Sequence, residues 1–370
     1  MNFDFSDDQR MLRDQARRFL SEQASPDKVR AVLESDATHD AALWQAMGEL
    51  GWMGTALPEE FGGLGMGQVE LCVIAEELGR SLAPVPFSST VYLAANAILL
   101  AGGEEQKREL LPALAAGETI AAFALGEGTA AATAKSLKTT VRDGRLSGTK
   151  TPVADGDIAD LLVVVAQGGG GPVLCLVDPK AGGVERTPVE TVDPTRSHAT
   201  LAFDAAPATV LGDGGDQWAL IEQVLDRAAV LFAFEQIGGA QACLEMATEF
   251  AKERFAFGRP IGSFQAIKHK LADIYIKTEL ARSNSYFGAW ALNSGAAELP
   301  VAAAAARVAA NEAFNFAAAE NIQTHGGMGF TWELDCHMYY RRAKLLALAL
   351  GSQKRWKDRL IDRLEQRNAA

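Results

Sequence analysis

The sequence predicts an α+β multidomain protein in which an antiparallel β domain stands between two helical domains. Apolar residues recur at helical spacing in the first third of the chain and again from Trp218 onward. Between them, short β-prone runs alternate with Gly, Pro and Asp, which is typical of a sandwich or barrel. The 370 residues are enough for two or three domains. We therefore expect an N-terminal α-helical domain at 1–118, a middle β domain at 119–215 and a C-terminal helical-bundle domain at 216–370.

The N-terminal domain is predicted to begin with a capped helix. Ser6 is a residue type that caps helices, and Asp7 and Asp8 after it complement the positive end of the helix dipole. The stretch Leu57–Gly65 contains one proline and three glycines and is predicted to be a loop. Further helices are expected at Leu43–Leu50, Val69–Leu82 and Val91–Ala101.

The middle and C-terminal domains differ in the period of their apolar residues. The run Gly168–Gly171 is expected to be a hairpin loop rather than a phosphate cradle, because no helix follows it. Strands are expected at Thr119–Leu125, Leu161–Ala166, Val173–Val177 and Thr200–Phe203. Four long helices of a bundle are expected at Leu220–Phe255, Gln265–Leu292, Val301–Thr324 and Tyr339–Arg367.

Composition excludes several classes of function. The formal net charge of −12 disfavours nucleic acid as a partner. No run of eighteen or more apolar residues predicts a membrane span, and the acidic start is unlike a secretory signal. The four cysteines are scattered and predict buried free thiols, and the five histidines are too dispersed to predict a metal site. We therefore expect a soluble cytoplasmic protein.

Two segments carry the chemistry. They are ERFAFGRPIGSFQAIKHKLAD at Glu253–Asp273 and QTHGGMGFTWE at Gln323–Glu333, with a weaker third segment at Leu57–Gly65. Together with the α–β–α order, they resemble the acyl-CoA dehydrogenase family over almost the whole chain. Each of the first two segments alone would only be suggestive, but their combination is specific. The resemblance implies FAD as the cofactor.

The resemblance assigns roles to six residues of these segments. Arg254 offers a cation for the pyrophosphate, Phe257 an aromatic face, and Gln265 an amide. Glycine lets the backbone approach a cofactor closely. In the family these positions reach across a subunit interface to the FAD of a neighbouring protomer. Taken singly, each could equally be a helix-end residue or a turn glycine. The cofactor-binding residues expected in these two segments are Arg254, Phe257, Gln265, Gln323, Gly326 and Gly327.

The reaction implied by the resemblance is α,β-desaturation of an acyl-CoA thioester in fatty acid or steroid side-chain degradation. A carboxylate removes the α-proton and the flavin takes the hydride from the β-carbon. The implied partners are an acyl-CoA substrate, an electron-transfer flavoprotein and a homologous subunit in a homo- or heteromeric dimer or tetramer.

The carboxylate base departs from the family pattern. Counting from Gln323 places Leu350 at the usual base position, and leucine cannot accept a proton. The alternative position, on the first long helix of the bundle, is Ala228. Two acids nearby, Asp226 and Glu235, are therefore candidates for a displaced base. Asp226 matches a family position near the CoA pantetheine, although it could equally be a solvated surface acid.

The flavin-facing strands also depart from the family. Leu125 and Gly126 are also expected to contact the cofactor, but Gly126 stands where the family places a hydroxyl beside the flavin ring. Pro152-Val153-Ala154 replaces a Trp-Ile-Thr sequence. Contacts to a protomer's own flavin are thus eroded, whereas those to a neighbour's flavin are kept. We infer a division of labour, in which this chain completes the FAD site of a catalytic homologue. Alternatives are a self-sufficient homotetramer with a displaced base, a scaffold without flavin, and a flavin oxidase or monooxygenase.

Overall fold

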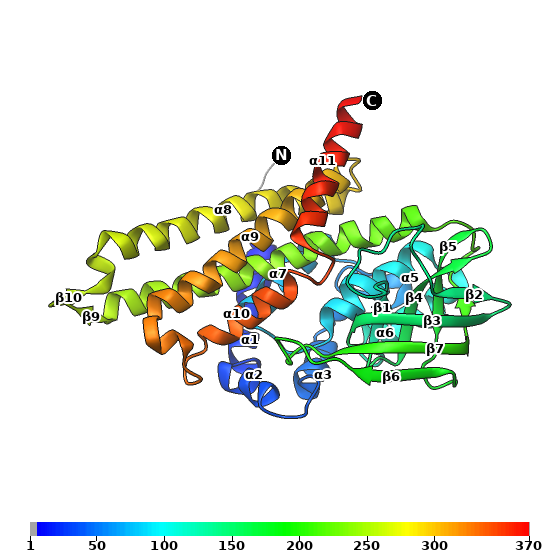
Figure 1. Cartoon of the computed structure of the whole chain (residues 1–370), viewed down its shortest axis with the longest axis horizontal. Coiled ribbons are helices and arrows are strands. Elements are labelled where there is room, and N and C mark those ends of the chain that lie inside the picture. Colours follow the sequence, from blue (N-terminus) through cyan, green and yellow to red (C-terminus); the bar gives the residue numbers. More distant parts are fainter. Residues whose placement is uncertain (1–5, 370) are drawn as a thin grey trace. The chain divides into compact units, whose positions relative to one another are not determined.

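The computed structural model describes residues 6–369 and groups the chain into two compact units. The first unit holds the chain up to Ala31, Gln68–Ala83 and the chain from Ala229 onward, and the second holds Val32–Gly67 and Pro84–Ala228. Helices precede and follow a β-sheet along the chain (Figure 1), so the predicted fold class is confirmed. The three sequence domains with their boundaries stay a prediction.

The first unit is helical, and its first helix begins where the sequence predicts. Ser6 Oγ accepts a hydrogen bond from the Gln9 N–H at 3.2 Å, and the Gln9 side chain accepts from the Ser6 N–H at 3.0 Å, which forms a capping box. The helices are α1 Asp7–Gln23, α2 Pro26–Leu33 (which runs into the second unit), α4 Gln68–Arg80, α7 Trp218–Glu253 (from Ala229 on), α8 Gln265–Ser294, α9 Leu299–His325, α10 Cys336–Leu346 and α11 Gln353–Ala369.

The prediction of the last helix was wrong in one respect. The continuous helix expected at Tyr339–Arg367 is two helices, α10 and α11, separated by the segment 347–352. Gly351 within that segment has φ +96°, which a right-handed helix does not allow. Helical periodicity continues across the break, so the sequence pattern alone did not show it.

Helices α4 and α7 cross at two glycines. A Cβ built on Gly79 would lie 1.8 Å from the carbonyl oxygen of Glu235, and one on Gly238 would lie 1.8 Å from the carbonyl oxygen of Glu76. The two backbones are therefore in direct contact at this crossing. No residue larger than glycine fits either position without moving a helix.

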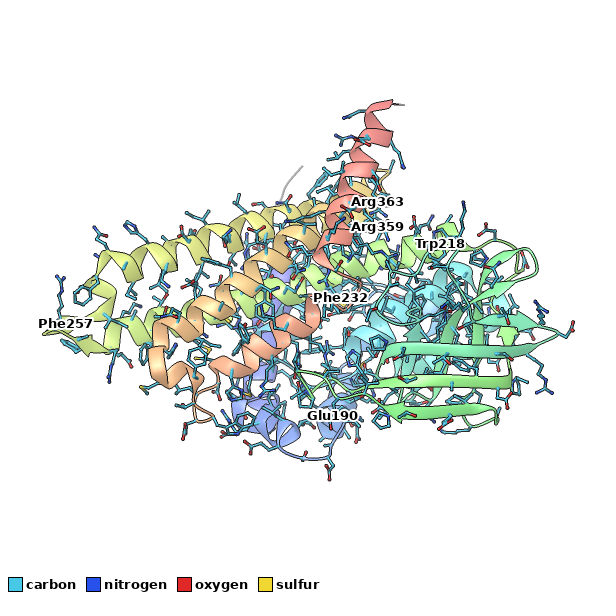
Figure 2. All side chains as sticks on the ribbon, viewed as in Figure 1. Glu190, Trp218, Phe232, Phe257, Arg359 and Arg363 are labelled. Carbon is cyan, nitrogen blue, oxygen red and sulfur yellow. The ribbon has the colours of Figure 1, made fainter. Side chains whose placement is uncertain are left out.

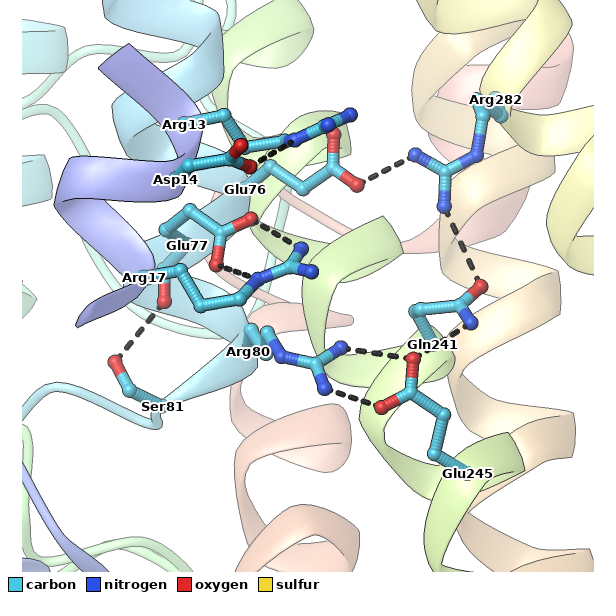
Figure 3. Close-up of polar contacts among 10 residues, drawn as sticks. All are labelled: Arg13, Asp14, Arg17, Glu76, Glu77, Arg80, Ser81, Gln241, Glu245 and Arg282. Carbon is cyan, nitrogen blue, oxygen red and sulfur yellow. Dashed lines mark hydrogen bonds and ion pairs between the residues drawn. The ribbon is translucent and has the colours of Figure 1, made fainter. Parts of the chain in front are cut away.

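A network of arginines and carboxylates surrounds this crossing (Figure 3). Arg17 of α1 makes a bidentate pair with the buried Glu77 of α4, at 2.7 and 3.0 Å. Arg282 of α8 donates to the buried Glu76 at 2.5 Å, and Arg80 pairs with Glu245 of α7. These pairs join α1, α4, α7 and α8. Paired in this way, the buried carboxylates avoid the large penalty of an isolated buried charge.

The second unit is built on one sheet with strand order β6-β7-β3-β2-β4-β5-β8, and β1 pairs with β4. Most neighbours are antiparallel, as predicted, but β1 and β2 each run parallel to β4. The Gly168–Gly171 run is the tight hairpin between β4 and β5. The strands are β1 Ala121–Ala124, β2 Thr140–Arg142, β3 Arg145–Ala154, β4 Leu161–Gly168, β5 Gly171–Val177, β6 Val184–Pro188, β7 His198–Pro207 and β8 Thr209–Val210.

The helical part of the second unit contains a π-helix. The predicted helix Val91–Ala101 begins earlier, as a π-helix η3 at Ser88–Ala95, and continues as α5 Asn96–Ala101. All eight residues of η3 are buried. The remaining helices are α3 Ala41–Glu49, η1 Trp52–Gly54, η2 Glu59–Phe61 and α6 Glu104–Ala115.

The cysteines agree with the prediction. All four, Cys72, Cys175, Cys243 and Cys336, are buried free thiols. In the part of the chain that the structure describes, no helix is long and apolar enough to cross a membrane. Within residues 6–369, no three His, Cys, Asp or Glu side chains gather as they would around a metal ion.

Candidate functional site

The residues of the two diagnostic segments gather at one end of the first unit. Helices α8 and α9 run antiparallel, because Lys270 pairs with Glu320 at 2.5 Å and Lys277 with Glu312 at 2.9 Å. The start of α8 therefore lies beside the end of α9, and Figure 1 shows the hairpin of β9 and β10 at the same end. We call this end the hairpin end. It includes Arg254, the hairpin Phe255–Pro260, Gln265, Gln323 and the 3-10 helix η5 at Gly326–Phe330.

Most of the predicted cofactor contacts at the hairpin end are exposed. Arg254, Gln265, Gln323 and Gly327 are all exposed, whereas Gly326 is partly buried. A Cβ added to Gly327 would meet no atom within 4 Å. Nothing in the chain's own packing therefore requires glycine at position 327. The space beside Gly327 is open, and without a Cβ the backbone can be approached closely by a group from outside the chain.

Phe257 is displayed at the tip of the hairpin (Figure 2). Its side chain is 96% exposed, and its backbone has φ +53°, followed by Gly258 with φ +77°. Two positive φ values between paired strands are the signature of a type I′ turn, for which Asn-Gly is the favoured sequence. A phenylalanine in this place is both exposed and strained. The positive φ costs folding free energy, and the exposed ring gains little burial within the chain to offset that cost.

Replacing Phe257 with Asn is expected to leave the isolated chain as stable as before, or more stable by about 1 kcal/mol. Asparagine adopts positive φ more readily, and the loss of the edge contact with Phe264, 6.1 Å between ring centroids, offsets part of the gain. The same substitution is expected to reduce FAD retention in an assembly. Urea denaturation and flavin absorbance measure the two effects. A destabilised F257N chain would contradict the turn argument.

Several exposed apolar residues of the two diagnostic segments were not predicted as site residues. Phe255 is 62% exposed, Phe330 78%, Trp332 47% and Met328 44%. All four lie within the two diagnostic segments, so their position in these segments could have identified them as candidates. Apolar side chains clustered on an exposed face are typical of an interaction surface.

The Leu125–Gly128 segment, which the sequence predicts to contact the flavin, is joined to β3 by hydrogen bonds. The Gly126 carbonyl accepts from the Thr151 N–H at 2.8 Å, and the Gly128 N–H donates to the Thr151 carbonyl at 2.8 Å. The Leu125 carbonyl accepts from Lys150 Nζ at 3.1 Å. Three backbone groups of this edge are thus bonded within the chain, and Gly126 offers no side chain to a ligand.

A buried ion pair supports the same edge and was not predicted from the sequence. Lys150 is fully buried, and its Nζ lies 2.8 Å from Glu127 Oε1. The Glu127 carboxylate also accepts from the Lys138 and Thr139 N–H groups at 2.7 and 2.9 Å. Burial alone would raise the pKa of Glu127, but these donors bring it from 4.5 to about 2. Desolvation lowers the pKa of Lys150, and the carboxylate opposes that shift.

The candidate base positions are all buried. Leu350 is 7% exposed, and its carbonyl accepts from Trp356 Nε1 at 3.1 Å. Asp226 is 3% exposed, so it is not a solvated surface acid. Glu235 is 2% exposed and faces Arg342, with Oε1 3.8 Å from Nη1. The neighbouring Arg307 also feels the charge of Glu235. Two arginines therefore face the buried Glu235 carboxylate inside the helical bundle.

The residues of the hairpin end fit a dinucleotide flavin. Arg254 supplies a cation for a pyrophosphate, Gln265 and Gln323 supply amides, and Gly327 allows close approach of the backbone. The Leu125–Gly128 edge fits a flavin less well, since Gly126 has no hydroxyl and three backbone groups of the edge are already bonded. The hairpin end therefore fits a flavin better than the Leu125–Gly128 edge does.

Comparison with known proteins gives consistent matches. The N-terminal domain model of acyl-CoA dehydrogenases matches residues 6–118, and the C-terminal domain model matches residues 215–364. The chain is 35% identical over 355 residues to acyl-CoA dehydrogenase IpdE2 of Mycobacterium tuberculosis, with 94% of each chain covered.

Two solved structures whose names join two proteins are similar over nearly the full length. A variant of the Tcur3481-Tcur3483 steroid ACAD has a TM-score of 0.89 at 35% identity, covering 98% of this chain and 99% of that one. The ChsE4-ChsE5 complex from Mycobacterium tuberculosis has a TM-score of 0.89 at 28% identity, covering 99% of both chains.

Proposed function

Because the chain belongs to the acyl-CoA dehydrogenase family, we propose that it is one subunit of a FAD-dependent enzyme that desaturates an acyl-CoA thioester, and that it completes the FAD site of a homologous catalytic chain. The observation that carries the proposal is the exposure of Arg254, Phe257 and Gln265 at the hairpin end. These side chains are of types that bind a cofactor, and the chain itself leaves them exposed. Such an arrangement fits a site that is completed on another subunit.

The residues of the hairpin end would hold and orient the cofactor. Arg254 would neutralise the pyrophosphate as a bidentate donor, and the amides of Gln265 and Gln323 would donate to polar atoms. Gly327 would let its backbone come close, because no Cβ intervenes. When bound, FAD supplies the hydride acceptor for the desaturation. Phe257 would cover an apolar part of the site and exclude water from it.

Removal of the α-proton is assigned to the partner chain in this proposal. Leu350 has no group that can accept a proton, and Glu235 faces Arg342 inside the helical bundle. The homologous subunit would therefore carry the carboxylate base and the hydroxyl beside the flavin.

The names of the solved relatives support a heteromer and a bulky polycyclic acyl group as substrate. Two of them join two protein names, and one of these is called a steroid ACAD. We place the assembly in the cytoplasm, with an electron-transfer flavoprotein as acceptor.

The proposal is tested by purifying the chain alone and together with a homologous subunit that carries the base. Flavin absorbance per chain and turnover with an acyl-CoA are then measured. We expect a nearly colourless, inactive chain on its own and a yellow, active two-chain assembly. Full FAD occupancy and turnover by the chain alone would overturn the proposal.

A homomeric enzyme with Asp226 as a displaced base is the second candidate. The burial of Asp226, 3% exposed, favours it, because buried carboxylates are uncommon without a structural or chemical role. In an active homomer, Asp226→Asn would reduce kcat by at least about a hundredfold, as loss of a general base does. Unchanged turnover of the D226N homomer would exclude this candidate.

A further inference from the structure

Arg227, in the α7 segment of the second unit, is a mostly buried cation with a single neutral partner. Its Nε donates to Asn96 Oδ1 at 2.9 Å. Among residues 6–369 the structure shows no other hydrogen bond or ion pair for this side chain. Burial lowers the pKa of Arg227, and no carboxylate counteracts it. Even Asp226, the preceding residue, does not balance the charge, because consecutive helix residues point about 100° apart.

Asn96 fixes the orientation of the guanidinium. Asn96 is the first residue of α5, directly after the π-helix η3, and its Nδ2 donates to the carbonyls of Val91 and Tyr92 at 3.2 and 3.1 Å. With the amide nitrogen held by two carbonyls, Oδ1 is turned toward Arg227. Arg227 is therefore bound through Nε, and the edge formed by Nη1 and Nη2 stays available. That edge is a planar fork matched to two oxygens of one anion.

The residues that flank the Arg227–Asn96 contact along α7 and η3 are buried. Val91 is 5% exposed and Tyr92 0%, and Leu225 and Ala228 on α7 are buried. The π-helix beside it is of a rare kind that is frequently found at functional sites. A cation in such surroundings destabilises the fold unless a counter-charge is present. An anionic ligand would supply that counter-charge in the bound state.

We propose that the Nη1–Nη2 edge of Arg227 binds a paired-oxygen anion carried by an acyl-CoA ligand, either a carboxylate on the acyl group or a phosphate of the CoA. This site lies in the second unit and does not involve the hairpin end or FAD. The inference rests on the proposed function in one respect only, which is that the ligand is an acyl-CoA. Recognition of an acidic acyl group would make Arg227 a specificity-determining residue.

Isothermal titration of the chain, alone and co-purified with a homologous subunit, tests this site. The probes are glutaryl-CoA, which ends in a carboxylate, butyryl-CoA, which does not, and CoA. The variants are Arg227→Met and the matched control Arg142→Met, which removes an exposed arginine from β2. We expect glutaryl-CoA to bind about ten- to a hundredfold more tightly than butyryl-CoA, and R227M alone to abolish the difference.

Each outcome either distinguishes an acyl carboxylate from a CoA phosphate as the bound anion or refutes the proposed site. If R227M weakens all three probes by one common factor, the anion is a CoA phosphate. If R227M changes no dissociation constant, or if no probe binds to either preparation, the site is refuted. If R227M fails to fold, Arg227→Lys replaces it, since lysine keeps the charge but lacks the fork, and an intermediate loss is expected. Because no arm requires flavin, failure here leaves the FAD proposal untouched.

Discussion

The chain with Gly238 replaced by Ala is expected to unfold with a free energy lower by about 3 kcal/mol or more. The added methyl would lie 1.8 Å from the Glu76 carbonyl oxygen and 2.8 Å from the Arg80 nitrogen. Both are backbone atoms of α4, so no side-chain rotation relieves the clash and the helices must separate. Separation would also strain the ion pairs around the crossing, such as Arg282 with Glu76.

The sign of this result is diagnostic, because alanine is the better helix former by about 1 kcal/mol. Urea denaturation of the isolated chain measures the effect. Gly327→Ala is the matched control, since its methyl meets no atom within 4 Å. G238A as stable as G327A would mean that α4 and α7 do not touch in solution.

Glu127→Gln is expected to lower the free energy of unfolding by about 3 kcal/mol, because it leaves the fully buried Lys150 without a counter-charge. The double variant E127Q with Lys150→Met removes both charges. It is expected to recover much of the loss, since the penalty comes from the unpaired ion. A double variant no more stable than E127Q would show that the pair contributes through shape rather than charge.

The effect of Glu127 depends on pH in a defined direction. Its folded pKa, about 2, lies below its ordinary value of 4.5. The stabilisation is therefore complete above about pH 4.5 and is lost as the pH falls toward 2. The difference in unfolding free energy between wild type and E127Q should be constant near neutrality and shrink between these values. A difference that grows on acidification would contradict the assignment.

The fold could be predicted from the sequence where periodicity dominates. The long helices α7, α8 and α9 were each placed within about three residues of their ends, because apolar period and flanking Gly or Pro coincide there. The break before α11 was not, since it depends on the positive φ of one glycine, Gly351, within a continuing helical pattern. Strands β2, β3 and β6 were missed because they are short or half exposed and alternate weakly.

The candidate site could be predicted only in part. The motif residues at the hairpin end are brought together as a set, because α8 and α9 are antiparallel and joined by salt bridges. The Glu127–Lys150 pair, the Arg342–Glu235 pair and the Arg227–Asn96 contact escaped prediction. Each joins residues between 23 and 131 positions apart, and no periodic pattern reports such distances.

We propose that the hairpin end of this chain holds the FAD of another subunit. Its most direct test is the flavin content of a two-chain assembly in which Arg254→Met is placed in this chain, or the equivalent arginine of the catalytic homologue is replaced instead. We predict that R254M in this chain weakens FAD binding by at least about tenfold, as loss of a charge-assisted pair does, whereas the substitution in the homologue leaves FAD bound. Full FAD content with R254M in this chain, or loss caused only by the homologue's substitution, would contradict the account.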